Sequence, residues 1–482
     1  MTVDHTRRNV LKTAATGGAA LAVAAAAARS PAQPRTRRPN IVFILADDMG
    51  YADVSSYGRH DLVTPNIDRI AAQGTRFTQA YANSPVCTAS RVAIITGRYQ
   101  LRLSVGLEEP ISGRTQRGIG LPPSHPTLPS LLRKAGYGTM LVGKWHLGAL
   151  PDFSPHKSGY DHFYGFRSGS VDYYLHTSRV GAPDFWDEER LIAQEGYTTE
   201  LFGDRAVKAI GDYALAGQPF LLSLHFNAPH WPWEAPGDQA ESERLRGRDT
   251  IDWDGGSQET YRRMISAMDA QVGRVLRALE DGGIASDTIV IFTSDNGGER
   301  YADTWPFSGK KTELLEGGLR VPAIISWPGR VVAGQVSEQV SANMDWLPTL
   351  LAAAGTVPDP AYPPDGMNLL PHLTEGAPVA ERKLFWRYKG LWQRAARIGN
   401  WKYLKILDNT FLFNVVDDPL ERANLKERRK DIYERLVGEW NAWNATMLPE
   451  TVTSSTDNFT GAEMADHIGT KRVTLDPDPD LR

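Results

Sequence analysis

Two pairs of residues with oxygen-bearing side chains end apolar runs of the sequence. Asp47 and Asp48 directly follow the continuous apolar run 40–46, and Asp295 and Asn296 end another run of the same kind. Adjacent carboxylates repel each other unless a cation or several hydrogen-bond donors neutralise them. Either pair alone could be a turn or a helix cap. Together they form the all-oxygen ligand set that Ca²⁺, or alternatively Mg²⁺, prefers, so they predict one divalent-cation site.

The single cysteine, Cys87, excludes an intramolecular disulfide and raises the question of its own role. A lone cysteine is ordinarily a small hydrophobic residue of the core. Arg91 follows it by four residues, so a helix that begins near Cys87 would carry both side chains on one face. The N-terminus of that helix would add a favourable field for an anion. The spacing therefore predicts positive charge beside residue 87.

Residues 87–98, CTASRVAIITGR, resemble the signature of the type I sulfatase family, which belongs to the alkaline-phosphatase-like superfamily. The signature runs Cys-x-Pro/Ala-Ser-Arg, four further residues and Thr-Gly-Arg, and Ala89 stands where proline is commoner. The resemblance implies that a formylglycine-generating maturation enzyme oxidises Cys87 to formylglycine. The hydrate of this aldehyde supplies the nucleophilic oxygen in the family. Arg91 is expected to help neutralise the sulfate oxygens.

Further blocks of the sequence match motifs of the same family, in the same order along the chain. They contain Lys144 and His146 in 143–148, His230 in 228–232, and Lys311 in 309–322. The resemblance implies that the two lysines bind sulfate, that His146 lies beside formylglycine and that His230 protonates the leaving group. An isolated lysine or histidine after a strand is usually a surface group. A transition state that gains negative charge on its oxygens needs convergent cations and proton donors, and this set supplies them.

The segment 158–176 resembles the corresponding region of arylsulfatase B and N-acetylgalactosamine-6-sulfatase relatives, and we expect it near the mouth of the substrate site. Trp231, Trp233 and Trp305 offer faces on which a sugar or aryl ring can stack, although such residues more often belong to the core. His225 lies within a predicted strand and outside the family motifs. We expect it to be structural.

Apolar, β-branched runs alternate with helical patterns over the first three quarters of the chain. The runs are 40–46, 138–142, 220–226, 288–293 and 321–325, and the helical patterns are 64–73, 127–135, 261–279 and 345–354. Such alternation predicts an α/β fold with a parallel sheet flanked by helices. The resemblance implies that this is the large mixed, mostly parallel sheet of the alkaline-phosphatase-like superfamily. Ligands of such sheets bind outside the carboxyl ends of the strands.

The sequence changes in character after about residue 360. Three short aromatic strand candidates, 384–388, 401–406 and 411–414, precede a helical pattern over 425–443. They predict a smaller C-terminal antiparallel sheet plus helix. The expected organisation is a catalytic α/β domain over 36–360, a small α+β domain over 361–450 and a tail over 451–482.

The N-terminal segment 1–35 has the features of a twin-arginine export signal. Arg7 and Arg8 precede the Ala/Gly-rich stretch 13–28, which is too short and too weakly apolar to span a membrane stably. We therefore expect export to the periplasm or the medium through the export machinery. The net charge of −4 gives the whole chain no electrostatic footprint for nucleic acid.

These features favour a sulfuric ester hydrolase of the arylsulfatase type that acts on a sulfated small molecule or saccharide. Two alternatives stay open: a phosphonate or phosphate ester hydrolase on the same scaffold, and a non-catalytic protein that binds sulfated glycans. Phosphatases with two metal ions in this superfamily need further His and Asp ligands, whereas Asp295 is followed by an asparagine here. The ligand set therefore favours one metal ion.

Overall fold

The computed structural model describes residues 38–111, 118–247 and 255–450. Within these ranges the strands are β1 (Asn40–Ala46), β2 (Gly74–Phe77), β3 (Ala80–Tyr81), β4 (Gly138–Lys144), β5 (His162–Phe166), β6 (Trp186–Asp187), β7 (Arg190–Leu191), β8 (Phe220–His225), β9 (Thr288–Ser294), β10 (Ala323–Ser326), β11 (Gln335–Ser337), β12 (Ser341–Ala342), β13 (Lys383–Tyr388), β14 (Gln393–Ile398), β15 (Trp401–Ile406) and β16 (Asn409–Asn414).

The helices of the same ranges are α1 (Pro65–Ala72), α2 (Cys87–Thr96), α3 (Leu128–Lys134), α4 (Thr198–Ala216), α5 (Gln239–Leu245), α6 (Gln258–Asp281), α7 (Glu316–Leu319), α8 (Trp346–Ala353), α9 (Leu370–Thr374) and α10 (Lys430–Asn444). None of these helices is both long and apolar enough to cross a membrane.

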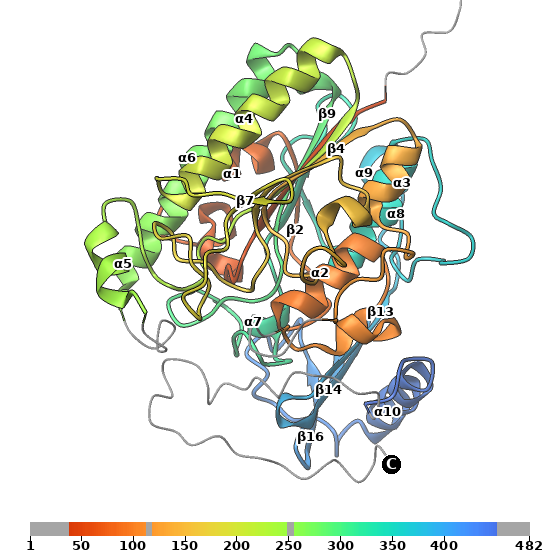
Figure 1. Ribbon diagram of the computed structural model, residues 1–482. Helices are drawn as coiled ribbons and strands as arrows, with labels where there is room; N and C mark the ends of the chain where they lie inside the picture. Colours follow the sequence, from red (N-terminus) through yellow and green to blue (C-terminus); the bar gives the residue numbers. More distant parts are fainter. Residues whose placement is uncertain (1–37, 112–117, 248–254, 451–482) are drawn as a thin grey trace, which may run out of the picture. The chain divides into compact units, whose positions relative to one another are not determined.

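A large mixed sheet forms the centre of the fold (Figure 1). Its strand order in the described residues is β11-β2-β10-β9-β1-β8-β4-β5-β6-β7. The central strands β9, β1, β8, β4 and β5 are parallel, whereas β10 is antiparallel to both of its neighbours. Every residue of β1, β4 and β9 is buried, which explains their continuous apolar sequences. The predicted mixed, mostly parallel sheet is confirmed.

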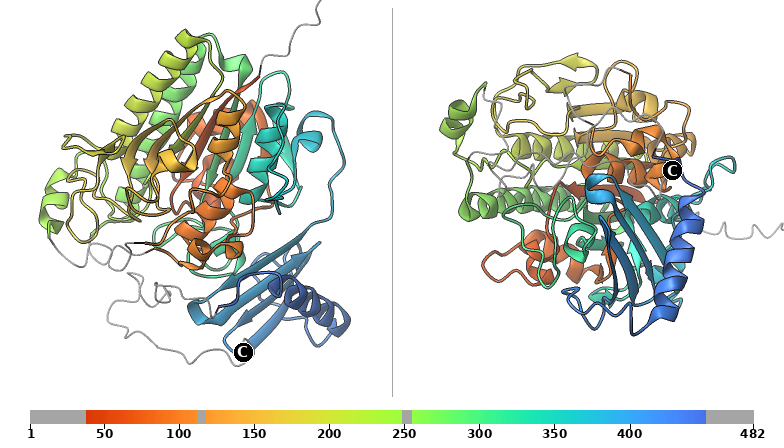
Figure 2. Two further views of the ribbon diagram at one scale, coloured as in Figure 1. Left: turned by 45° about the vertical axis from the view of Figure 1, so that its right-hand side comes forward. Right: turned by 90° about the horizontal axis from the view of Figure 1, so that it is seen from below.

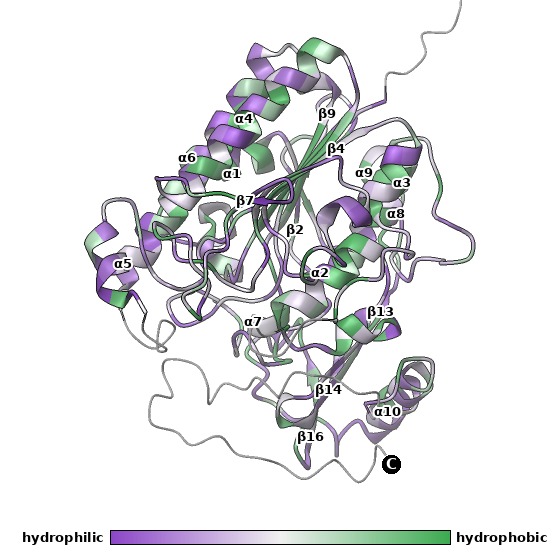
Figure 3. Cartoon of the chain, viewed as in Figure 1, coloured by the Kyte–Doolittle hydropathy of each residue, from purple (hydrophilic) through white to green (hydrophobic). Residues whose placement is uncertain are grey.

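Helices cover both faces of this sheet. The side chains of β1 alternate between the two faces. Val42 and Ile44 belong to a core cluster with residues of α1, α4 and α6, while Ile41 and Phe43 belong to a cluster with residues of α2, α3 and α8. This division follows from the alternation of side chains along a strand. In Figure 3 the central strands are green, and the helices over them carry purple on parts of their surfaces.

Helix α4 was not predicted from the sequence. Its buried residues include only two large apolar side chains, Phe202 and Ile210, beside small ones such as Ala206 and Ala209. Such a face gives a weak apolar stripe, so its helical period is hard to see. The helix nevertheless packs on α6 and against the core cluster that contains Val42.

The C-terminal residues form the predicted smaller antiparallel sheet, with the strand order β13-β14-β15-β16 and helix α10 packed on it (Figure 2). Strand β14 was missed, and α10 begins at Lys430 rather than at residue 425. Trp386 belongs to the core under this sheet and donates a hydrogen bond from Nε1 to the carbonyl oxygen of Ala82 at 2.9 Å. The proposed boundary near residue 360 stays a prediction. The segments 1–35 and 451–482 lie entirely outside the described residues.

Candidate active site

The carboxyl ends of β1 and β9 bring the two predicted pairs of oxygen ligands together. Ala46 pairs with Ser294, so Asp47 and Asp295 leave the sheet side by side. Asn296 donates from Nδ2 to Oδ1 of Asp48 at 2.7 Å. All four side chains are buried. The structure thus gathers the residues predicted to bind a metal ion at one edge of the sheet.

Two lysines from other parts of the chain pair with these carboxylates. Nζ of Lys144, at the end of β4, lies 2.6 Å from Oδ2 of Asp47, and Nζ of Lys311 lies 2.5 Å from Oδ2 of Asp48. Burial alone would raise the pKa of Asp48, but Lys311 and His230 outweigh it and lower that pKa. Asp48 raises the pKa of Lys311 well above its usual value against the effect of burial. Both members of this second pair are therefore charged.

Helix α2 begins at Cys87 and carries Arg91 one turn later, as the spacing predicted. Nε of Arg91 lies 3.0 Å from Oδ2 of Asp295, and its Nη2 lies 3.4 Å from Oδ1 of Asp47. The Cys87 side chain is buried, and burial raises the pKa of its thiol to about 12 although Lys144 and Lys311 act in the opposite direction. An unmodified Cys87 is therefore a protonated thiol and a poor nucleophile at neutral pH.

The two site histidines differ in the ring nitrogen that the protein engages. His230 donates from Nδ1 to the carbonyl oxygen of Trp231 at 2.6 Å, which leaves its Nε2 3.5 Å from Oδ2 of Asp48. His146 donates from Nε2 to the carbonyl oxygen of Ile111 at 2.9 Å, and its buried Nδ1 has no hydrogen-bond partner among the described residues. Burial, aided by nearby lysines, lowers the pKa of both rings well below the usual value.

The oxygen-rich cluster fits a divalent cation. Ligand atoms of Asp47, Asp48, Cys87 and His230 all lie within 4.8 Å of one another. Oδ1 of Asp47 and Oδ1 of Asn296 are buried acceptors without a hydrogen-bond partner in the described part of the chain. Burial and the neighbouring Asp47 carboxylate raise the pKa of Asp295 to about 6. A hard cation would bind acceptor oxygens of this kind and would reduce the repulsion between the neighbouring carboxylates.

Comparison with known proteins agrees with this geometry. The sulfatase family model matches residues 39–356, which contain every residue of the site described above. The chain belongs to the sulfatase family. It is an enzyme of the sulfuric ester hydrolase class, and members of the family generally use a metal ion and a formylglycine derived from cysteine.

The matches with individual relatives cover a larger share of the chain than the family model does. N-acetylgalactosamine-6-sulfatase of Homo sapiens is 36% identical over 385 residues, which cover 76% of this chain and 71% of the relative. Arylsulfatase J of Mus musculus is 31% identical and is matched over 86% of this chain and 77% of its own length. The crystal structure of Ps i-CgsB in complex with k-i-k-neocarrahexaose has a TM-score of 0.76 and 30% identity, and the match covers 84% of this chain and 92% of that chain.

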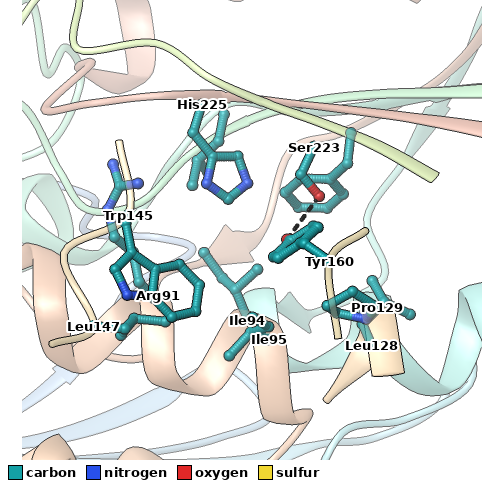
Figure 4. A pocket seen from close by; sticks show the side chains of 12 residues that line it. Arg91, Ile94, Ile95, Leu128, Pro129, Trp145, Leu147, Tyr160, Ser223 and His225 are labelled. Carbon is teal, nitrogen blue, oxygen red and sulfur yellow. Dashed lines mark hydrogen bonds between the residues drawn. The ribbon is translucent and has the colours of Figure 1, made fainter. Parts of the chain in front are cut away.

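His225 lies behind the sulfatase site, in a small internal cavity of about 20 Å³ that Arg91 also lines (Figure 4). Its Nδ1 is 3.3 Å from the carbonyl oxygen of Lys144, to which Nη1 of Arg91 also donates at 3.3 Å. Burial, with a contribution from Arg91, lowers the pKa of His225 to about 3, so the ring is neutral. Its contact is with the backbone that carries Lys144.

Tyr173 is a residue that the sequence did not single out for a role of its own. Its hydroxyl lies 2.8 Å from the carbonyl oxygen of Asn227 and 2.9 Å from that of His230. The ring is fully buried and stacks on Tyr197, with centroids 5.2 Å apart. Tyr173 therefore fixes the loop that carries His230. Only its place within 158–176 pointed towards the site.

A cavity of about 1240 Å³ opens beside His146. Arg167, Ser168 and Gly169 line it, so part of the segment 158–176 lies beside the site as predicted. Trp231 and Trp233 are buried and are packed in the core, whereas the Trp305 side chain is 64% exposed.

Proposed function

We propose that this sulfatase removes sulfate from a sulfated carbohydrate, with formylglycine at position 87 and one divalent cation, Ca²⁺ or alternatively Mg²⁺. The observation that carries the proposal is the convergence of Cys87, Lys144 and Lys311 on the Asp47–Asp48 pair. The names of an N-acetylgalactosamine-6-sulfatase and of a neocarrahexaose complex among the similar proteins support a carbohydrate substrate.

The cation would be held by Asp47, Asp48, Asp295 and Asn296. Their buried oxygens at two adjacent strand ends support this assignment, and the Oδ1 atoms of Asp47 and Asn296 make no hydrogen bond within the described part of the chain. When bound, the ion supplies Lewis-acid stabilisation of negative charge on the sulfate oxygens. The all-oxygen composition favours Ca²⁺ or Mg²⁺ over zinc.

Lys144, Lys311 and Arg91 would bind and orient the sulfate group. All three side chains are buried, so their charges act at low effective dielectric on oxygens that gain charge in the transition state. Formylglycine at position 87, as its hydrate, supplies the oxygen nucleophile that the protonated thiol cannot provide, and a carbonyl-forming route for release of sulfate. The position of Cys87 at the N-terminus of α2 adds a favourable field for the anion.

The two histidines would move protons in opposite directions. Because Nδ1 of His230 is held by Trp231, its Nε2 is the atom that can hold a proton for the leaving alcohol. Because Nε2 of His146 donates to Ile111, its free Nδ1 is the atom that can accept a proton from the side chain at position 87. These hydrogen bonds fix which ring nitrogen of each histidine is free to exchange a proton. The roles of acid for His230 and base for His146 are those that the resemblance to the family implies.

One set of measurements tests the function and separates its alternatives. Mass analysis of the peptide that contains residue 87 should find formylglycine, and kcat/KM should be highest for an aryl sulfate among matched aryl sulfate, phosphate and phosphonate esters. The Cys87→Ala variant should lose turnover while it keeps its fold, because it lacks the nucleophile precursor. A preference for the phosphonate ester would replace the proposal by its phosphonate alternative. Unmodified thiol in a protein that binds sulfated glycans without hydrolysis would favour a binding protein.

We also propose that the protein works in the periplasm or outside the cell. The basis is the sequence segment 1–35, with Arg7 and Arg8 before a weakly apolar stretch. Export of a folded chain suits a sequence with one cysteine and no disulfide to form. The partners implied are the export machinery and a formylglycine-generating maturation enzyme.

A further inference from the structure

The large cavity continues the active site along the edge of the sheet. Lys144 ends β4 and pairs with Phe166, the last residue of the neighbouring strand β5. Arg167 therefore follows β5 at the same edge, and its carbonyl oxygen accepts a hydrogen bond from the backbone N–H of His146 at 3.1 Å. A substrate whose sulfate lies near Lys144 can extend from there towards Arg167 through the cavity that His146 and Arg167 both line.

The side chain of Arg167 is held in place within this cavity. Its guanidinium carbon lies 3.9 Å from the centre of the Trp186 ring, and Nε lies 3.5 Å from Oδ1 of Asp184. That ion pair is long, and Nε makes no hydrogen bond to any residue in the described ranges. The side chain is 23% exposed. A guanidinium that is fixed by stacking and still partly open to solvent is preorganised to bind an anion.

Three acidic residues, Asp152, Asp184 and Glu189, line the same cavity. Asp184, the partner of Arg167 at 3.5 Å, also accepts hydrogen bonds from the backbone N–H of Ser168 at 2.8 Å and from Nε1 of Trp186 at 2.7 Å. Asp152 and Glu189 are exposed. Among the described residues that line the cavity, Arg167 is the one arginine or lysine.

We propose that Arg167 binds a second anionic group, a carboxylate or a further sulfate, on the part of the saccharide next to the sulfate that is removed. This proposal rests on the proposed function and narrows its substrate class to oligosaccharides with more than one negative charge. The volume of about 1240 Å³ exceeds the roughly 300–1,000 Å³ of typical small-molecule sites, so it admits more than one sugar ring. The planar guanidinium suits both carboxylate and sulfate, since each presents two oxygens to its N–H groups.

The test compares substrates that share the scissile sulfate and differ in the second charge. The substrates are 4-nitrophenyl sulfate, a monosulfated neutral disaccharide, the same disaccharide with a second sulfate, and a monosulfated disaccharide with a uronate. Arg167→Ala should reduce kcat/KM for at least one of the two doubly charged disaccharides by about 10- to 100-fold more than for the neutral disaccharide, mainly through KM. The doubly charged disaccharide that shows this loss identifies the second group as sulfate or carboxylate. Arg167→Lys should recover part of the loss, because it restores the charge without the planar fork.

Arg205 provides a matched control for the loss of a stacked arginine. Its guanidinium carbon lies 4.1 Å from the centre of the Tyr164 ring, it pairs with Asp187 at 2.9 Å, and its side chain is 26% exposed, but it does not line the cavity. Arg205→Ala should affect all four substrates by similar factors. Equal losses for singly and doubly charged substrates in Arg167→Ala, or no loss, would overturn the proposal.

A binding measurement keeps this test separate from the proposed function. Calorimetric titration of the Cys87→Ala protein, with and without Arg167→Ala, should show weaker binding of the affected disaccharide in the double variant. If the wild-type protein hydrolysed no sulfate ester, the proposed function would fail while this titration still decided the role of Arg167. Unchanged affinity in the double variant would reject the second anion site even in an active sulfatase.

Discussion

At the scale of single residues, the environment of each histidine decides which proton it can move. The hydrogen bond to Trp231 gives His230 a fixed orientation, and Nε2 faces the Asp48–Lys311 pair. Burial and Lys311 favour the neutral ring. A bound sulfate ester would add negative charge beside this ring and so raise its pKa, which couples protonation of His230 to substrate binding.

The acid role of His230 predicts an effect that depends on the leaving group. A nitrophenolate leaves without help, whereas a sugar alkoxide needs a proton. His230→Ala should therefore reduce kcat/KM for a 4- or 6-sulfated hexosamine more than for 4-nitrophenyl sulfate, by a ratio of about 10²–10⁴. Steady-state kinetics with both substrates measures this ratio.

His125 offers a control for removal of a buried imidazole. It makes the same kind of bond, from Nδ1 to the carbonyl oxygen of the next residue, Pro126, at 2.8 Å. His125→Ala should lower both activities equally, through stability alone. Equal losses in His230→Ala would remove the acid assignment and leave a sulfate-binding role for this histidine.

At the scale of elements, the register of β1 on β9 determines whether a cation can bind. Asn296 follows β9 and contributes an acceptor, Oδ1, that no described residue satisfies. Asn296→Ala should lower both the metal content and kcat, and added Ca²⁺ or Mg²⁺ should restore activity in part because the three carboxylates remain. Metal analysis after dialysis and activity against added metal measure the two effects.

Asn40 at the opposite end of β1 is the matched control. It is buried and donates from Nδ2 to Oγ1 of Thr288 at 3.2 Å, far along the strands from the carboxylates. Asn40→Ala should reduce stability without a change in metal affinity. Full metal content in Asn296→Ala, or stoichiometric zinc that neither Ca²⁺ nor Mg²⁺ can replace, would contradict the assignment.

A buried group of charges connects the C-terminal sheet to α7. Nζ of Lys402, on β15, lies 2.9 Å from Oε1 of Glu316 and 2.9 Å from Oε1 of Glu421. Burial raises the pKa of Glu421 to about 7 against the effect of Lys402, and the carboxylate of Glu316 adds to the increase. Lys402 and nearby arginines lower the pKa of Glu316 although burial acts in the opposite direction.

This arrangement predicts that Glu421 weakens the fold as pH rises. In the unfolded chain its pKa is near the usual value of 4.5. Between pH 4.5 and 7 the folded state binds the proton more tightly, so the free energy of unfolding decreases with increasing pH. Glu421→Gln removes this ionisation, and its stability relative to the wild type should improve by about 1–3 kcal/mol between pH 5 and pH 8. Urea unfolding at pH 5, 6.5 and 8 measures the difference, with the exposed Glu427→Gln as control. A constant difference across this range would show that Glu421 does not titrate as described.

At the scale of the whole molecule, the sequence was sufficient to predict strands that are buried along their whole length and site residues that lie within family motifs. The run 41–46 is apolar throughout because both faces of β1 are covered, so it could be recognised. Strand β14 could not, because its buried residues include Gln393 and Arg397, which hydrogen-bond with Thr312 and Gln79 far away in the chain. The role of Arg167 was hidden for the same reason, since it depends on Trp186 and Asp184.

The last prediction concerns the route of the whole chain. If Arg7 and Arg8 are read by the twin-arginine export machinery, the double variant Arg7→Lys, Arg8→Lys should accumulate in the cytoplasm, because that route depends on the arginine pair and the following stretch is only weakly apolar. Immunoblots of periplasmic and cytoplasmic fractions of a bacterial host measure the distribution. The retained protein should be folded and resistant to protease, since it needs no disulfide to reach its structure. The variant Arg37→Lys, Arg38→Lys, which changes the arginine pair just beyond the proposed signal, should be exported as the wild type is. Undiminished export of the Arg7→Lys, Arg8→Lys protein would show that the segment is not a twin-arginine signal.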